Sequence, residues 1–529
     1  MREAATLTGP NLKPGGNKLL SAGVLVLLLV GAVYAVSHLL ADLHGVHSSS
    51  ILPYVLLGVA LLIALGFEFV NGFHDTANAV ATVIYTHSLP PTAAVVWSGT
   101  FNFLGVLTSS GAVAFTVVSL LPVELILQVG SSAGFAMVFA LLIAAIIWNL
   151  GTWYFGLPSS SSHTLVGSII GVGLMNQLMA PASNGTSGVD WDQALGIGRA
   201  LLVSPAVGFI GSALLLLILK AVVPIKSLYK APEGNNPPPL WVRALLIFTC
   251  TGVSFAHGSN DGQKGMGLIM LILIGTVPTA YALNASLIGE PAQHFITVSE
   301  QATATLGNYG AGIVAAADVR PAVTAYVQTK RLQADTLPAL RQLTSDIAQS
   351  MVAYKAMANV PQDKVPNIRN DMYLSDEALR LMIKNGAPSF NPADLVILKS
   401  YRGELDQATK FIPTWVKVAV AIALGLGTMI GWKRIVVTVG EKIGKDHLTY
   451  GQGASAEMVA MLTIGAADMY GLPVSTTHVL SSGVAGTMAA NGSGLQFDTV
   501  RNMIMAWVLT LPVSIMLSGG LFWLFRMTF

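Results

Sequence analysis

Apolar runs long enough to cross a lipid bilayer recur along the whole chain. A helix of about twenty residues spans roughly 30 Å of hydrocarbon. Such runs lie near residues 19–40, 52–70, 93–121, 135–156, 197–221, 266–288, 414–432 and 502–525, and shorter or interrupted ones near 163–180, 243–256, 453–470 and 472–490. Because lipid offers no partner for a free backbone N–H or C=O, each span should be helical. The pattern predicts an all-α polytopic membrane protein with about ten to twelve transmembrane helices.

The composition agrees with a membrane protein. Of the 529 residues, 53% are hydrophobic and 10% are charged, whereas soluble domains carry about 25% charged residues. The formal net charge of +2 comes with no basic cluster of the kind that binds nucleic acid. The one cysteine, Cys250, excludes an intramolecular disulfide and makes a thiol-ligated metal site implausible.

The charged loops predict which side of the membrane each end faces. Two short loops, 220–243 and 432–445, are rich in Lys and Arg, so both should face the cytoplasm. The polar segment 291–411 mixes both charge signs at helical spacing and predicts a helical insert outside the membrane. A single crossing near 414–432 separates it from the second basic loop, which puts it on the outer side. The first apolar run lacks a small-residue cleavage site and is predicted to be an uncleaved helix, with a cleaved signal peptide as the alternative.

Two pairs of short motifs indicate an internal duplication. "FVNGFHD" at 69–75 matches "FAHGSND" at 255–261, and "GLPSSSSH" at 156–163 matches "GLPVSTTH" at 471–478. The order is the same in both halves, and the polar insert accounts for most of the longer spacing in the second. Repeats with Gly- and Pro-interrupted apolar segments at corresponding positions are typical of secondary transporters, whose binding site lies between the repeats.

The repeat also predicts the topology and the division of the chain. If each GLP motif forms a re-entrant hairpin, three full crossings separate the two Asp motifs, and the halves are inverted. The expected parts are an extra N-terminal helix (1–50), a first repeat (51–220), a cytoplasmic linker (221–243), a second repeat in two pieces (244–290 and 412–529), and the insert (291–411).

The GLP motifs have the chemistry of an anion site. Gly and Pro end one helix, and hydroxyl residues stand where the next would begin. Such residues cap free N–H groups, and the positive end of the helix dipole favours an oxyanion in front of it. The candidate anion ligands are Ser160, Ser161, Ser162, Ser475, Thr476 and Thr477. Ordinary capping of a kinked helix is the alternative, which two copies make weaker. His163 and His478 could donate to the anion or carry a proton, or simply be buried histidines.

The Asp motifs point to a cation rather than an anion. A carboxylate repels an anion unless a cation intervenes, so Asp75 and Asp261 are candidate sites for a proton, sodium or a divalent metal. Neutral oxygens suited to such ions come from Asn71, Asn78 and Asn260. Because histidine is the side chain type that changes charge near neutral pH, His74 favours proton handling, and Lys264 is placed to pair with Asp261. Three further intramembrane acids without acidic repeat partners stay candidates for the pathway: Glu68, Glu457 and Asp468.

These motifs resemble a known family. "GFHDTANA" at 72–79 and "GSNDGQKG" at 258–265 resemble the paired G-A-N-D-x-A-N-A signatures of the inorganic phosphate transporter (Pit/PiT) family, and "GLPVSTTH" resembles its second conserved element. The resemblance implies an inverted-repeat phosphate symporter of the plasma membrane (the inner membrane in a bacterium), often homodimeric, with no permanently bound cofactor. It assigns ion and substrate binding to Asp75, Asn78, Asn260 and Asp261, and phosphate binding to Ser160–Ser162 and Ser475–Thr477.

The chain departs from the family signature at His74 and at Gly262–Lys264. These changes remove two amide ligands, add titratable groups, and put sodium coupling in doubt. The variant pattern is similar to the low-affinity bacterial Pit transporters, which are associated with proton coupling and with neutral metal–phosphate complexes. The resulting expectation is a proton-coupled phosphate symporter in which Asp75, Asp261, His74 and Lys264 handle coupling, and Asp75 and Asp261 hold any transported metal. The alternatives are a sodium-coupled phosphate or sulfate carrier on the same scaffold and, more remotely, a membrane hydrolase using Ser160, His163 and Asp75.

Overall fold

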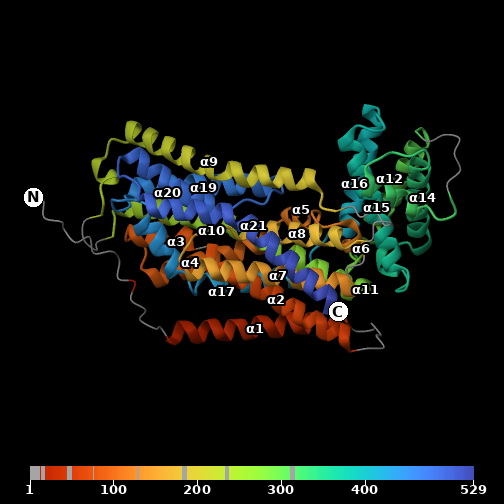
Figure 1. Ribbon diagram of the computed structural model, residues 1–529, viewed down its shortest axis with the longest axis horizontal. Helices are drawn as coiled ribbons and strands as arrows, with labels where there is room; N and C mark the ends of the chain where they lie inside the picture. The colour runs from red at the N-terminus through yellow and green to blue at the C-terminus, as the bar shows by residue number, and fades with distance from the viewer. Residues whose placement is uncertain are drawn as a thin grey trace, which may run out of the picture.

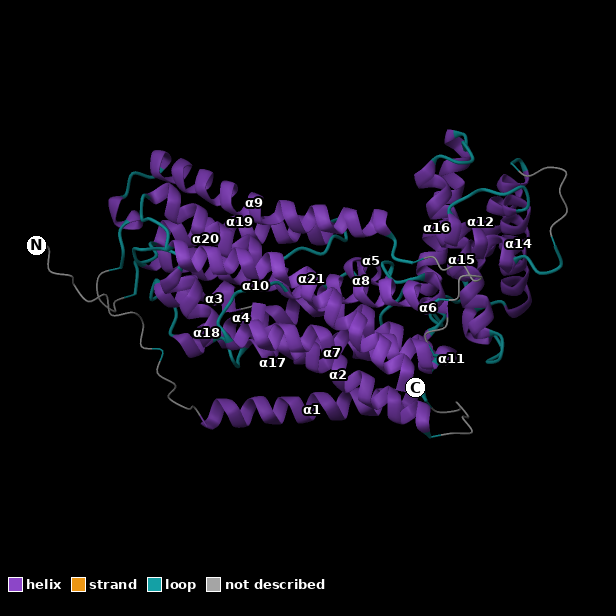
Figure 2. Cartoon of the chain, viewed as in Figure 1, coloured by secondary structure: helices purple, strands orange, loops and turns teal. Residues whose placement is uncertain are grey.

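The protein is built of helices joined by short segments. The computed structural model describes residues 12, 18–43, 51–75, 77–127, 130–180, 188–232, 237–309 and 316–528. Figure 2 shows helices and loops throughout this part of the chain, with no strand drawn in it. The prediction of an all-α polytopic membrane protein is confirmed.

The helices follow the predicted repeats. After α1 (Lys18–Asp42), the first half contains α2 (Leu52–Asp75), α3 (Ala77–Tyr85), α4 (Pro91–Thr108), α5 (Ala112–Val118), α6 (Val123–Leu127), α7 (Ser132–Tyr154), α8 (Ser161–Met179) and α9 (Trp191–Val222). The second contains α10 (Leu240–Thr276), α11 (Pro278–Tyr281), α17 (Thr414–Thr428), α18 (Lys433–Val437), α19 (Tyr450–Met469), α20 (Thr476–Asn491) and α21 (Phe497–Thr528). The insert contributes α12 (Glu290–Gly307), α13 (Arg320–Thr329), α14 (Thr336–Tyr354), α15 (Val365–Asn385) and α16 (Pro392–Thr409).

Length and composition alone identify fewer spans than the apolar runs predicted. In the described part of the chain, 6 helices are long and apolar enough to cross a membrane, or up to 8 if two bent pairs each count as one span. The pairs are α4 with α5, bent by 77°, and α16 with α17, bent by 72°. Helices α8, α19 and α20 do not meet the same test, because their windows are shorter or more polar.

The two halves have inverted topology. Helices α4 and α10 run parallel, since Ser98 Oγ lies 2.8 Å from Ser254 Oγ, and a Cβ at Gly262 would lie 2.6 Å from Val106. The short turn 86–90 reverses the chain between α3 and α4, so α4 runs opposite to α2 and α3. Helix α10 is therefore antiparallel to α2, although these two helices carry the matched Asp motifs. This is the inversion that the repeat predicted.

The GLP motifs form re-entrant hairpins that enter from opposite faces. Both ends of the α7–α8 hairpin lie on the side of the insert, where Arg380 of α15 pairs with Asp190 after α8 at 2.8 Å and α6 bonds α13 before α7. Both ends of the α19–α20 hairpin lie on the other side, where Lys445 N donates to Gly494 O at 3.1 Å. Helix α7 is long enough to cross the membrane, but α8 returns to the face from which α7 came.

Each hairpin is supported by the last long helix of the other half. Helix α8 packs along α21, and α20 packs along α9. These contacts are too close for side chains: a Cβ at Gly171 would lie 2.2 Å from Ile515 O, and one at Gly486 would lie 2.1 Å from Phe209 O. Glycine lets the backbones touch at both places, as small residues do between membrane helices.

The insert sits at the end of the bundle opposite the basic loops (Figure 1). Since the positive-inside rule predicts that the basic loops face the cytoplasm, the insert is expected on the outer side. Within the insert, Asp376 accepts from Arg402 Nε at 2.8 Å and from Lys410 Nζ at 3.0 Å. Burial raises the pKa of Asp376, but the charges of Lys410 and Arg402 outweigh it and leave the pKa below its ordinary value. The insert therefore has its own ion-pair network as well as an apolar core.

Candidate functional site

The two hairpin tips have the same local structure. Gly156 and Gly471 adopt φ values of 67° and 63°, a left-handed conformation that favours glycine, and they end the preceding helices. Helices α8 and α20 then begin at Ser161 and Thr476, as predicted. Ser160 Oγ accepts from His163 N at 3.2 Å, and Ser475 Oγ accepts from His478 N at 3.1 Å. Ser160 and Ser475 are thus N-caps, and the next two residues of each helix also carry hydroxyls.

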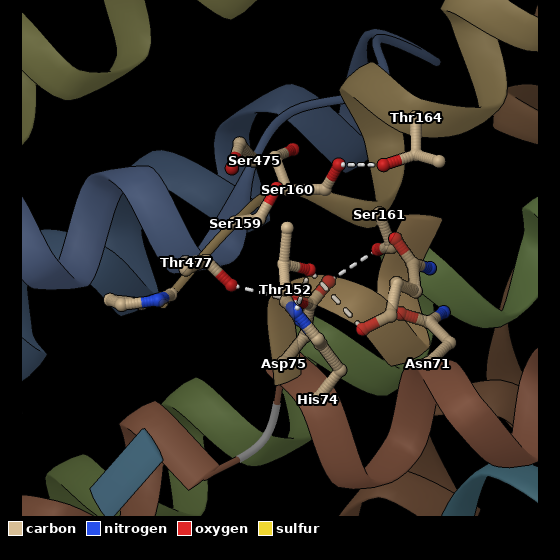
Figure 3. Close-up of polar contacts among 12 residues, drawn as sticks. Asn71, His74, Asp75, Thr152, Ser159, Ser160, Ser161, Thr164, Ser475 and Thr477 are labelled. Carbon is tan, nitrogen blue, oxygen red and sulfur yellow. Dashed lines mark hydrogen bonds and ion pairs between the residues drawn. The ribbon is translucent and has the colours of Figure 1, made fainter. Parts of the chain in front are cut away.

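Asp75 joins both hairpins at the end of α2 (Figure 3). Its carboxylate accepts from Ser161 of one hairpin and from Thr477 of the other at 2.8 Å. His74 Nδ1 lies 2.8 Å from the same Oδ1 that Thr477 contacts, and its Nε2 lies 3.1 Å from Thr152 Oγ1. Residues of the two repeats that lie far apart in the sequence therefore contact one carboxylate, that of Asp75.

Asp261 occupies the equivalent place in α10, where Ser161 Oγ lies 3.5 Å from its Oδ2 and a lysine bridges its other oxygen to the next hydroxyl of the same hairpin. Lys264 Nζ donates to Asp261 Oδ1 at 2.7 Å and to Ser162 Oγ at 2.5 Å. In the first half, the corresponding hydroxyl, Thr477, reaches Asp75 directly. The Lys264 side chain is 1% exposed. Its ammonium therefore lies in the buried centre, where it bridges the Asp261 carboxylate and the Ser162 hydroxyl.

A third potential ligand for a cation comes from His257. Asp75, Asp261 and His257 each offer a ligand atom, and these atoms lie within 4.8 Å of one another. All three residues are buried. Carboxylate oxygens and imidazole nitrogen suit a divalent transition metal. We did not predict His257 from the sequence, although it is the repeat partner of Asn71 and lies one turn before Asp261.

Not every predicted ligand faces this centre. The Asn260 amide donates to Leu472 O at 3.0 Å and accepts from Val474 N at 3.4 Å, so it fixes the backbone of the second hairpin. The side chain of Asn78 lies outside the described residues.

Thr476 Oγ1 is buried and has no hydrogen-bond partner in the described part of the chain. A buried hydroxyl without a partner is costly unless a ligand completes it.

The two hairpin histidines lie against each other behind the hydroxyls. The ring centroids of His163 and His478 are 4.6 Å apart, and His163 Nδ1 lies 2.9 Å from Ser160 Oγ. Nε2 of His478 has no partner among the described residues. The pair is therefore available for hydrogen bonding at the inner side of the hairpin tips.

The other intramembrane acids have separate surroundings. Glu457 accepts from Thr249 at 2.5 Å and from Thr82, and Asp468 accepts from Ser259 at 2.6 Å and Gln263 at 2.7 Å. Both carboxylates are thus held by neutral donors away from Asp75. Glu68 is completely buried, and its Oε1 has no partner in the part of the chain that the structure describes.

Comparison with known proteins identifies the family to which the chain belongs. The model of the phosphate transporter family matches residues 71–518, which include Asp75, Asp261 and both GLP motifs. The chain belongs to this family. Its relatives include the low-affinity inorganic phosphate transporters PitA and PitB of Escherichia coli (strain K12), which are 43% and 41% identical to it. Each alignment covers 89% of this chain and 96% of the relative. A probable low-affinity inorganic phosphate transporter of Bacillus subtilis (strain 168) is 29% identical over 90% of this chain and 99% of its own.

A solved structure titled "The sodium-dependent phosphate transporter" also matches. It is 19% identical, with a TM-score of 0.49, over 90% of this chain and all of that chain.

Family membership settles the broad alternatives. The chain is a phosphate transporter of the Pit family and a multi-pass protein of the plasma membrane. Its relatives are named as transporters and not as enzymes, so the hydrolase alternative is rejected. The Ser160–His163 contact that it required is part of the N-cap of α8.

Proposed function

We propose that this Pit-family protein is a proton-coupled phosphate symporter that carries phosphate together with a divalent metal. The observation that carries the proposal is the buried Lys264 ammonium, which lies between Asp261 and Ser162. Coupling is assigned to Asp75, Asp261, His74 and Lys264. Phosphate is assigned to the hairpin hydroxyls, with Ser160 and Ser475 acting through the helix starts that they cap.

The lysine disfavours sodium at Asp261. A sodium ion that bound ahead of phosphate would add a second positive charge beside the ammonium that already neutralises Asp261 at 2.7 Å, and like charges repel strongly in a buried site. A proton does not need a coordination site of its own, because a side chain that is already present can bind and release it. His74, 2.8 Å from Asp75, is such a group.

The charge of the centre supports a metal as part of the cargo. Two carboxylates and one ammonium leave a formal charge of minus one when the neighbouring histidines are neutral. Adding a hydrogen phosphate dianion would make the buried charge still more negative, which is costly in a low-dielectric site. A divalent cation held by Asp75, Asp261 and His257 would cancel the charge of the phosphate. The cargo is then a neutral metal–phosphate pair.

We expect uptake to follow a proton gradient and to need no sodium. The purified protein in proteoliposomes should take up labelled phosphate when the outside is made acidic, in sodium-free buffer. Uptake should rise when magnesium or another divalent metal is added. An inward sodium gradient at equal pH should give no accumulation, and sulfate in excess should compete weakly. Strictly sodium-dependent uptake that ignores an imposed pH gradient would reject the coupling proposal while leaving phosphate transport intact.

Replacing Thr476 with Val should weaken phosphate binding without destabilising the phosphate-free protein. The Thr476 hydroxyl has no hydrogen-bond partner in the described structure, and Val keeps its shape. Loss of one hydrogen bond to a charged ligand is worth about 1.5 to 3 kcal/mol, so phosphate affinity should fall at least about tenfold. Equilibrium binding of labelled phosphate to the detergent-solubilised protein measures the change.

The matched control is Thr487→Val in the same helix. Thr487 is also buried, but its hydroxyl donates to Val484 O at 2.8 Å within α20. This substitution should leave phosphate affinity unchanged. If Thr476→Val also left the affinity unchanged, the anion would have to lie elsewhere than at the hairpin tips.

A further inference from the structure

A second polar cavity lies outside the buried centre, between the insert and the outer end of the bundle. Its volume is about 430 Å³, and its walls include Gly111 and Ala112 at the break between α4 and α5, Gly267 of α10, and charged residues of α15 and α16. Figure 1 shows these elements meeting where the insert joins the bundle. None of the residues assigned to the central site lines this cavity.

A thin layer separates this cavity from the second hairpin. Ala112 lines the cavity and also lies against Gly471, where an added Cβ would come within 3.1 Å of it. The next residue, Val113, donates its backbone N–H to Gln263 Oε1 at 2.9 Å. Gln263 lies one residue before Lys264. The cavity therefore ends at the break between α4 and α5, directly outside the hairpin tip.

Most of the charges around the cavity are already paired. Arg380 pairs with Asp190 at 2.8 Å and Glu377 at 2.5 Å, and Lys410 pairs with Asp376 at 3.0 Å and with Asp406. Arg402 and Lys330 also pair with Asp376 and Asp190, at 2.8 Å and 3.6 Å, so four cations balance the four carboxylates and the cavity is not left negative.

Arg369 is the exception among the cations of the cavity wall. It is 7% exposed, forms no ion pair with the carboxylates that the structure describes, and its Nε has no hydrogen-bond partner there. One terminal nitrogen donates to Asn370 Oδ1 at 3.2 Å, and the guanidinium carbon lies 5.2 Å from the Tyr373 ring. Burial lowers the pKa of Arg369, yet a guanidinium in a protein stays protonated.

A buried guanidinium whose N–H donors lack hydrogen-bond partners is suited to binding an anion. Its forked N–H groups match the geometry of a tetrahedral oxyanion, with two parallel hydrogen bonds. We propose that Arg369 makes this cavity an outer phosphate site, in which inorganic phosphate binds before it reaches the hairpins. The proposal rests on phosphate transport, which the family establishes, and not on the choice of coupling ion.

A single introduced cysteine can test binding at this place. Cys250 is the sole cysteine of the chain and is buried, so Ser119→Cys in the cavity wall would be the reactive thiol for a charged, membrane-impermeant maleimide. Inorganic phosphate should slow its labelling in the absence of any ion gradient. Arg369→Gln should shift the protecting phosphate concentration upward at least about tenfold, whereas Thr476→Val should leave it unchanged.

The possible outcomes separate the outer site from the central one. If Arg369→Gln does not change the phosphate concentration that protects the thiol, the proposal is overturned. Protection that shifts with Thr476→Val alone also overturns it, since the thiol would then report phosphate at the hairpins. Protection that disappears with Arg369→Gln and is partly restored by Arg369→Lys supports a charge-dependent site at this residue.

Uptake kinetics give a second readout. Arg369→Gln should raise the KM for phosphate about tenfold with kcat little changed, because the outer site concentrates substrate but takes no part in the central exchange. Arg331→Gln removes the same charge from an exposed position of the same insert and should leave KM unchanged. An unaltered KM in Arg369→Gln, in protein that is monodisperse by size-exclusion chromatography, would also overturn the proposal.

Discussion

Replacing Asp75 with Asn should lower coupled phosphate uptake at least about a hundredfold while the protein remains folded and inserted. The carboxylate accepts from Thr477, Ser161 and a nitrogen of His74. An amide keeps the shape but loses the charge, and it presents its own N–H donors to groups that are already donors. Two hydrogen bonds to a charged group, each worth about 1.5 to 3 kcal/mol, are weakened together.

The measurement is labelled phosphate uptake into proteoliposomes under an imposed proton gradient. Asp498→Asn is a matched control, because it makes the same chemical change on a side chain that is 85% exposed at the start of α21. It should transport normally. Asp261→Asn should lose uptake as Asp75→Asn does. Near-normal uptake in Asp75→Asn would mean that its carboxylate only holds the hairpins in place.

Removing Lys264 alone should destabilise the protein, and removing Asp261 with it should restore much of that stability. Lys264→Gln leaves a fully buried carboxylate without its cation, and breaking a buried ion pair from one side costs about 3 to 5 kcal/mol. The double variant Lys264→Gln with Asp261→Asn removes both charges of the pair and so adds no uncompensated charge to the centre. Neither variant should transport phosphate in response to a proton gradient.

Thermal unfolding of the detergent-solubilised protein would order the three forms. Wild type should unfold at the highest temperature, the double variant next and Lys264→Gln lowest, with the difference between the variants measuring the coupling of the pair. If Lys264→Gln were as stable as wild type, the pair would not be ionised in the buried centre. No ammonium would then oppose sodium binding at Asp261.

The parts of the site that could be predicted follow from local rules repeated twice. Glycine and proline break a helix, a hydroxyl caps the next one, and the same pattern recurs in both halves, so the α8 and α20 starts and the two aspartates could be selected from the sequence. The inverted topology followed from counting crossings between the motifs. All of these features depend on short stretches of chain and on their order.

What could not be predicted depends on contacts between distant segments. Asn260 matches a family ligand position, yet its amide bonds the backbone at Leu472 and Val474, because the hairpin tip packs against that face of α10. His257 was not predicted as a ligand from the sequence, because only the antiparallel crossing of α2 and α10 places it beside Asp75. Arg369 lies in an insert without a repeat partner, so no comparison within the chain could mark it.

The exchange of helices between the halves has a consequence for synthesis at the ribosome. Helix α8 carries Ser161 and ends at Met179, but α21, along which it packs, ends at Thr528 and is made after all the other described helices. At translation rates of about 5 to 20 residues per second, α8 waits on the order of tens of seconds for that partner. During this time the nascent first half holds a polar hairpin in the membrane with α7 as its support. The phosphate-binding centre is therefore completed only after the carboxyl-terminal helix has left the ribosome.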